Sequence, residues 1–169
     1  MYPEGLMKTI LADYALPFSG VHGPAHWARV LENGAHLAKL TGADLEIVQL
    51  FAVLHDSRRF DEGECHAHGP RAADFAQSLR GSRIYLDDHR FALLHDACAR
   101  HTDGETEADI TVQTCWDADR LDLGRVWINP DPSRLCTEPA RDPALIEWAT
   151  GRAQEKFLPA VLDDWLEGI

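Results

Sequence analysis

The sequence lacks several features that would assign it to particular classes of protein. No apolar run approaches the roughly 20 residues that a membrane-spanning helix requires, and the N-terminus has neither the charge order nor the apolar stretch of a signal peptide. The four cysteines form no CxxC pair, which excludes a redox pair or a zinc ribbon of that type, and we expect them to be reduced and mostly buried. These absences predict a cytoplasmic protein with no membrane partner.

Patterns typical of β-strands are also scarce. Strict alternation of apolar and polar residues is hard to find, whereas apolar residues recur at helical spacing along most of the 169 residues. Helices are predicted over about 6–14, 24–40, 44–55, 70–81, 89–101, 109–123, 143–156 and 158–167, with an irregular loop at 57–68. The length suits one domain. We therefore predict an all-α bundle formed by 1–169, with its motif-bearing core at about 20–125 and the helices within 143–167 packing on that core.

Positive charge is in short supply. Lysine and arginine together number 16 against 28 acidic residues, which gives a net charge of −12. Such a surface repels phosphate backbones and anionic lipid headgroups, so a nucleic-acid polymer or a membrane is excluded as a partner and a small substrate is favoured. Thirteen of the basic residues are arginines, whose forked guanidinium suits phosphate. Histidine is unevenly distributed, because all nine lie between His22 and His101.

Several of these histidines fall on apolar faces of the predicted helices. His26 lies on the buried face of 24–40, and the apolar helix 44–55 ends in the adjacent pair His55 and Asp56. His101 and Asp119 also share faces with apolar residues. One histidine in such a position is more often a hydrogen-bonded core residue, but several buried histidines and carboxylates would each need a partner. One divalent ion satisfies them together, and a mixed His/Asp set suits manganese, iron, nickel or zinc.

Five segments carry a resemblance to a known family. They are HGPAHWARV at 22–30, LFAVLHDSRR at 50–59, HGPRAADFA at 68–76, ARHTDGE at 99–105 and CWDADRLDLGR at 115–125. In this order they resemble the HD superfamily of metal-dependent phosphohydrolases, an all-helical fold named after an adjacent His-Asp pair. The resemblance implies a helical bundle with a metal site in its core, whose ligands are His26, His55, Asp56 and Asp119.

The resemblance also suggests roles for residues around these four. His68 and His101 look like the two extra ligands of two-metal members, or alternatively they line a one-metal pocket and bind substrate oxygens. One ion is the main expectation and two ions are the alternative. Substrate-binding or catalytic roles are expected for Arg59, Arg58, Arg29 and His22. Asp122 is expected to orient a metal ligand from behind or to cap Arg125.

Metal-dependent hydrolysis of a small phosphoester, such as a nucleotide, is the activity that this resemblance implies. The ion would activate a water molecule for attack on phosphorus. Two alternatives remain open at this point: a di-iron oxygenase of the same superfamily, which would need His68 and His101 as ligands, and a regulatory module that binds a nucleotide without turnover. The sequence contains no motif that identifies the substrate, the general acid or the oligomeric state.

Overall fold

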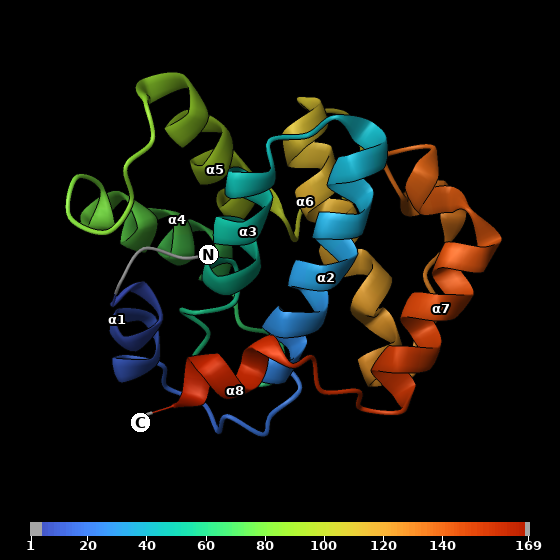
Figure 1. Cartoon of the computed structure of the whole chain (residues 1–169), viewed down its shortest axis with the longest axis horizontal. Coiled ribbons are helices and arrows are strands. Elements are labelled where there is room, and N and C mark those ends of the chain that lie inside the picture. The colour runs from blue at the N-terminus through green and yellow to red at the C-terminus, as the bar shows by residue number, and fades with distance from the viewer. Residues whose placement is uncertain (1–4, 168–169) are drawn as a thin grey trace.

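The computed structural model of the chain describes residues 5–167, and within that range it contains helices and no β-strand (Figure 1). The α-helices are α1 (Leu6–Ala12), α2 (Pro24–Thr41), α3 (Leu45–Leu54), α4 (His68–Leu79), α5 (Asp88–Arg100), α6 (Ile110–Arg120), α7 (Pro143–Gln154) and α8 (Val161–Leu166). Three short 3-10 helices accompany them: η1 (Leu121–Val126), η2 (Pro132–Arg134) and η3 (Pro139–Arg141). Across the described residues, no helix is long and apolar enough to cross a membrane.

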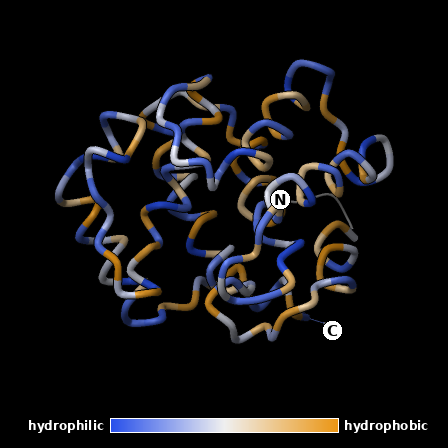
Figure 2. The backbone as a smooth tube through the Cα atoms, turned by 180° about the vertical axis from the view of Figure 1, so that it is seen from behind, coloured by the Kyte–Doolittle hydropathy of each residue, from blue (hydrophilic) through white to orange (hydrophobic). Residues whose placement is uncertain are grey.

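Helix α2 is the central element, and local chemistry sets both of its ends. Pro24 occupies its first turn, where a missing N–H costs no hydrogen bond. Gly42 ends it with a left-handed backbone conformation, φ 76°. α2 packs against α3 and α6, and α4 packs on α5 (Figure 1). Figure 2 shows apolar and polar residues alternating along the helices, so that each helix has an apolar face to bury.

Aspartates begin three of the helices that surround the core. The carboxylate of Asp44 accepts hydrogen bonds from the backbone N–H groups of Glu46 and Ile47 at the start of α3. Asp87 and Asp109 accept in the same way at the starts of α5 and α6. The predicted starts near Asp44 and Asp87 are therefore confirmed.

Two predicted boundaries in the N-terminal half are wrong by about half a turn. α1 ends at Ala12, so Tyr14 lies in the connection to α2 rather than on the first helix. α4 begins at His68 rather than at Pro70, because a proline in the first turn of a helix breaks no intrahelical hydrogen bond. The earlier start places His68 on the helix instead of in the preceding loop.

The helix predicted over 109–123 is also divided. Its α-helical part ends at Arg120, and the chain tightens into η1, which carries Asp122 and Arg125. The last predicted helix is shorter than expected, because the chain becomes helical only after Pro159, at Val161. The four cysteines are free, with three buried and Cys136 partly buried, as the sequence predicted.

The C-terminal part packs behind η1 through a separate small group of buried apolar residues. These are Leu37, Leu121, Leu135, Ala140, Leu145 and Ala149. The buried carboxylate of Asp117 also accepts hydrogen bonds from the backbone N–H groups of Cys136 and Thr137 and from the Thr137 hydroxyl, at 2.7–2.8 Å. Together these contacts fix η1 against α6, which determines where Asp122 and Arg125 lie.

Candidate metal centre

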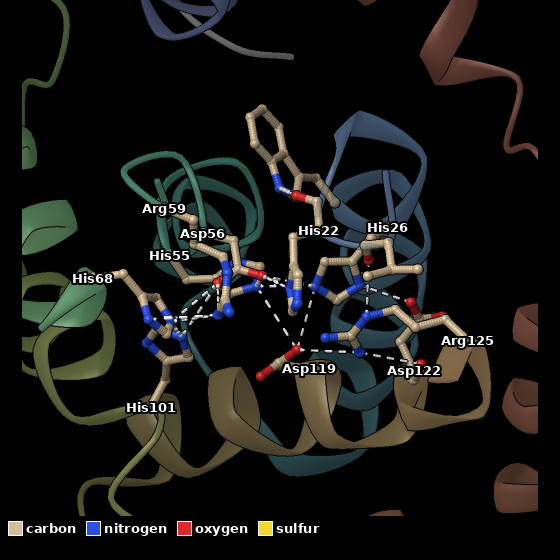
Figure 3. A network of polar contacts seen from close by, with 12 residues as sticks. His22, His26, His55, Asp56, Arg59, His68, His101, Asp119, Asp122 and Arg125 are labelled. Atoms are coloured by element: carbon tan, nitrogen blue, oxygen red, sulfur yellow. Dashed lines mark hydrogen bonds and ion pairs between the residues drawn. The ribbon is translucent and has the colours of Figure 1, made fainter. Parts of the chain in front are cut away.

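Three residues from two helices form the first group of the centre. His26 lies on the buried face of α2, and His55 and Asp56 follow the last residue of α3. The Nε2 atoms of His26 and His55 are 3.1 Å apart. Asp56 Oδ2 lies 3.6 Å from His26 Nε2 and 3.7 Å from His55 Nε2. These three side chains are almost completely buried and converge on one point (Figure 3).

Asp119, from α6, faces the same point from the opposite side. Its Oδ1 atom lies 3.4 Å from His26 Nε2 and 3.7 Å from His55 Nε2. Its side chain is 17 % exposed, against 0–3 % for the other three. The structure therefore brings together all four residues predicted as metal ligands, and Asp119 lies at the side of the centre nearest to solvent.

The spacing of the His26, His55 and Asp56 atoms fits one metal ion, and Asp119 Oδ1 lies within the same limit of both histidine nitrogens. Two ligand atoms that each lie about 2.1 Å from an ion cannot be more than about 4.2 Å apart. The five distances among the four ligand groups that involve a histidine nitrogen are 3.1–3.7 Å, within this limit.

Hydrogen bonds behind the two histidines leave the correct nitrogen free for a metal. The Nδ1 of His26 donates to Asp122 Oδ2 at 2.7 Å, and the Nδ1 of His55 donates to the carbonyl of Phe51 at 3.2 Å. Each Nε2 is therefore the nitrogen that faces the centre, where it can hold either a proton or a metal ion. Two lone pairs facing each other at 3.1 Å repel unless a proton or a cation lies between them. The residues present therefore fit a bound cation.

Asp122 is held in place by Arg29, which changes the role expected for that arginine. The guanidinium of Arg29 donates to both carboxylate oxygens of Asp122, at 2.7 and 3.0 Å, and to the carbonyl of Phe157 at 3.1 Å. Arg29 is 5 % exposed. The sequence predicted a substrate-binding role for Arg29, whereas here its donors orient the carboxylate that holds His26.

A second group shares Asp56 with the first. Asp56 Oδ1, the other oxygen of this carboxylate, lies 3.2 Å from His68 Nε2 and 3.7 Å from His101 Nε2, and these two nitrogens are 3.0 Å apart. The Nδ1 atoms of both histidines donate to backbone carbonyls, those of Cys65 and Cys98, so Nε2 is again the nitrogen that faces the shared carboxylate. Asp56, His68 and His101 could therefore hold a second ion.

Glycine makes this second group possible. His68 and His101 come from α4 and α5, which must approach closely for their rings to meet. A Cβ atom at Gly69 would lie 2.8 Å from the carbonyl oxygens of Cys98 and Ala99, closer than packed atoms tolerate. The absence of a side chain at Gly69 thus allows the two helices to bring His68 and His101 together.

The electrostatics of the centre favour a buried cation. Burial is the largest influence on His55 and lowers its pKa to about 3, so this ring is neutral. Burial opposes ionisation of Asp56 too, but the neighbouring His55, His101, His22 and His26 outweigh it and keep the pKa of Asp56 well below its usual range. His55 and Asp56 are thus already in the protonation states that metal binding requires.

His26 gives the metal affinity a pH dependence. Burial and Arg125 oppose its protonation, but the carboxylates of Asp119, Asp122 and Asp56 outweigh them and raise its pKa to about 9. Below that pH the metal-free centre holds a proton on Nε2 that an ion must displace. We expect the affinity for Mn²⁺ to rise by about tenfold per pH unit between about pH 6.5 and 8.5. Anaerobic calorimetric titration measures this slope, and a flat profile would contradict the assignment of Nε2.

Arg58 and Arg59 are adjacent in the chain but point in different directions. Arg59 is buried at the centre, with Nη1 3.6 Å from Asp56 Oδ1 and 3.2 Å from His68 Nε2. Arg58 turns away, and its guanidinium lies 3.4 Å from the centroid of the Phe75 ring. The structure therefore does not bring Arg58, predicted as a substrate-binding residue from its position beside the His-Asp pair, to the centre.

Two further residues complete the surroundings of the centre. His22, expected to have a substrate-binding or catalytic role, lies directly against the shared carboxylate, with Nδ1 2.8 Å from Asp56 Oδ2. Arg125 was not singled out as a candidate by the sequence reasoning, yet its Nη1 lies 3.9 Å from Asp119 Oδ1. The sequence offered a signal for Arg125, because it lies at the end of the same CWDADRLDLGR segment that carries Asp119. The tightening of the chain into η1 turns it toward the centre.

The helical fold and the buried His/Asp cluster define an all-α protein with a candidate metal centre, and comparison with known proteins supports this class. No family model matches the chain, and no curated protein matches it. Among solved structures, it is similar to a protein from an uncultured Thermotogales bacterium whose crystal structure is described as that of a predicted HD superfamily hydrolase. The two are 26 % identical and superpose with a TM-score of 0.67 over 89 % of this chain and 88 % of that one. The chain thus has the all-α HD fold, and its resemblance to the HD superfamily is confirmed at the level of structure.

Proposed function

We propose that the protein is a metal-dependent phosphohydrolase that acts on a small phosphoester. The observation that carries this proposal is the buried set of His26, His55, Asp56 and Asp119, in which both histidines turn Nε2 toward one point. A divalent ion held there lowers the pKa of a coordinated water and polarises a phosphoryl oxygen. The similarity to a protein described as a predicted HD superfamily hydrolase supports the same class of reaction.

The arginines of the centre are suited to binding the phosphoryl group. Arg59 lies beside Asp56 and His68, and Arg125 lies beside Asp119, so two guanidinium groups flank the ligand set on different sides. Non-reacting phosphoryl oxygens would accept hydrogen bonds from them, which neutralises charge that builds up during the reaction. Arg29, in contrast, acts only by holding Asp122.

The cavities next to the centre favour a small anionic substrate. One, of about 330 Å³, is bordered by Arg125 and Lys156 and by Arg29, whose charge is already paired with Asp122. Another, of about 180 Å³, touches His101 and is bordered by Arg120 and Arg134. Cationic cavities of this size in a chain of net charge −12 would concentrate small phosphate compounds, whereas the surrounding surface repels polymers. We therefore propose small phosphorylated compounds as substrates and no nucleic-acid or membrane partner.

Metal analysis combined with a substrate panel tests the proposed function. Untagged protein, as purified, should contain at least one equivalent of manganese, iron, nickel or zinc per chain. It should also hydrolyse members of a panel of phosphoesters and nucleotides. Chelation should remove activity and readdition of the metal should restore it. Protein that contains no stoichiometric metal and cannot be loaded with one would disprove the proposal.

The second histidine group supports one alternative function. If Asp56, His68 and His101 bind a second ion and both ions are iron, the di-iron oxygenase reading becomes the better one. The metal analysis distinguishes the readings, because two irons per chain with no phosphoester turnover favours the oxygenase. Ligand-induced stabilisation by a nucleotide without any product would instead favour a regulatory module.

A further inference from the structure

The hydroxyl of Tyr14 is buried but has no hydrogen-bond partner. Within residues 5–167, three buried side-chain polar atoms lack a partner: Tyr14 Oη, Arg58 Nη2 and Thr150 Oγ1. Tyr14 is 9 % exposed. Its ring is fixed by edge-on packing against Trp27, with centroids 5.0 Å apart, and by Phe18 at 6.0 Å. The ring is therefore held in place while its polar atom is left without an acceptor.

The charged groups that influence the pKa of this hydroxyl belong to the metal centre and to the loop that follows it in the chain, which carries Glu62. Burial is the largest influence on Tyr14 and raises its pKa, the charges of Glu62 and Asp56 raise it further, and Arg59 lowers it. The phenol thus stays protonated at neutral pH and remains a hydrogen-bond donor. The neighbouring Trp27 donates to the carbonyl of His22, whose ring contacts Asp56, so these contacts also link Tyr14 to the centre.

Folded proteins rarely leave a buried donor unpaired, because the group loses its bonds to water and gains nothing in return. A position that keeps such a donor beside a ligand site indicates that its acceptor arrives with the ligand. Phosphoryl oxygens are strong acceptors, and the Tyr14 ring packs on Trp27, which is joined through His22 to Asp56 of the centre.

We propose that Tyr14 is a substrate-binding residue whose hydroxyl donates a hydrogen bond to a non-bridging oxygen of the phosphoryl group bound at the centre. This inference rests on the proposed function, in that it assumes a phosphoryl group at the metal centre. It assigns a specific role to Tyr14, which lies in the connection between α1 and α2 although the sequence predicted it on a helix.

Tyr14→Phe isolates the hydroxyl, because phenylalanine keeps the ring that packs on Trp27. The ligand measured is inorganic phosphate, titrated by calorimetry into metal-loaded protein, with Tyr85→Phe as the matched control because Tyr85 is 68 % exposed. A hydrogen bond from Tyr14 to a charged oxygen predicts phosphate binding weaker by roughly 10- to 100-fold in Tyr14→Phe. Tyr85→Phe should bind phosphate like the wild type.

Thermal unfolding without phosphate supplies a second readout, because the variant that binds phosphate more weakly should not be less stable than the wild type. Removing an unpaired buried hydroxyl relieves a cost, so Tyr14→Phe should be as stable as the wild type or more stable, with the same metal content. A lower Tm would show that the hydroxyl has a partner within the fold, such as a buried water, and would overturn the inference. Unchanged phosphate affinity in the variant would overturn it as well.

Phosphate binding and phosphoester hydrolysis, measured separately, distinguish a failure of this inference from a failure of the proposed function. Phosphate binding is measured without turnover, so a wild type that hydrolyses no phosphoester but loses phosphate affinity in Tyr14→Phe would disprove the function and support the role of Tyr14. If the wild type hydrolyses phosphoesters and Tyr14→Phe binds phosphate as tightly as the wild type, the proposed function is supported and the role of Tyr14 is disproved. Metal-loaded wild type that binds no phosphate overturns the role of Tyr14 directly.

Discussion

Asp56→Asn is expected to remove both bound metal and hydrolysis. Asp56 is the residue shared by the two groups, with Oδ2 facing His26 and His55 and Oδ1 facing His68 and His101. Removing one partner of a buried charge pair costs about 3–5 kcal/mol, which corresponds to a loss of roughly 100- to 1,000-fold or more in metal affinity. Metal analysis of the purified variant and its phosphoesterase rate measure the effect.

Asp61→Asn provides the comparison for this variant. Asp61 lies in the exposed loop after the His-Asp pair, and its carboxylate caps only the backbone N–H of Gly63. The same change of charge should leave metal content and rate near those of the wild type. An Asp56→Asn protein that retains stoichiometric metal would show that the ion, if bound, lies elsewhere.

Arg59→Gln and Arg58→Gln should affect different properties: the first should lower activity, and the second should lower stability. Arg59→Gln removes a guanidinium that we propose binds the phosphoryl group, so kcat/KM should fall by roughly 10- to 100-fold, the cost of one hydrogen bond to a charged group. Arg58→Gln removes a guanidinium that packs on Phe75 and donates to the carbonyl of Asp13. It should lower the Tm while kcat/KM of the folded protein stays near the wild-type value.

Steady-state kinetics on metal-saturated protein and thermal unfolding test this pair of variants. Arg59 also donates to the carbonyls of Asp61 and Gly63, so metal content must be measured alongside the rate. Equal losses of kcat/KM in both variants would contradict the different orientations of the two side chains. A normal rate in Arg59→Gln would remove Arg59 from the proposed substrate site.

Much of this architecture could be predicted because its causes are local. Proline and glycine mark the ends of α2, and aspartate caps mark the starts of α3 and α5, all within a turn of the residues they control. The convergence of His26, His55, Asp56 and Asp119 followed from their segments and their apolar faces. Helical periodicity places a side chain on a buried face regardless of how the helices are later arranged.

The arginines could not be assigned in this way, because tertiary contacts decide where their long side chains point. Arg58 and Arg59 follow α3 in consecutive positions, and only the packing of α4 separates the one that meets Phe75 from the one that meets His68. Arg29 shares α2 with His26 but reaches Asp122, 93 residues away. Arg125 required the change from α-helix to η1, which periodicity does not indicate.

The hydrogen bond from Arg29 to the carbonyl of Phe157 has a consequence for the C-terminal third of the chain. Through Arg29 and Asp122, the segment after α7 is joined to the nitrogen of His26 that faces away from the metal position. A change that removes the hydrogen bond to the Phe157 carbonyl is therefore expected to loosen Arg29 and, through Asp122, the ring of His26. We infer that a region without a single histidine contributes to the orientation of a histidine in the candidate metal centre.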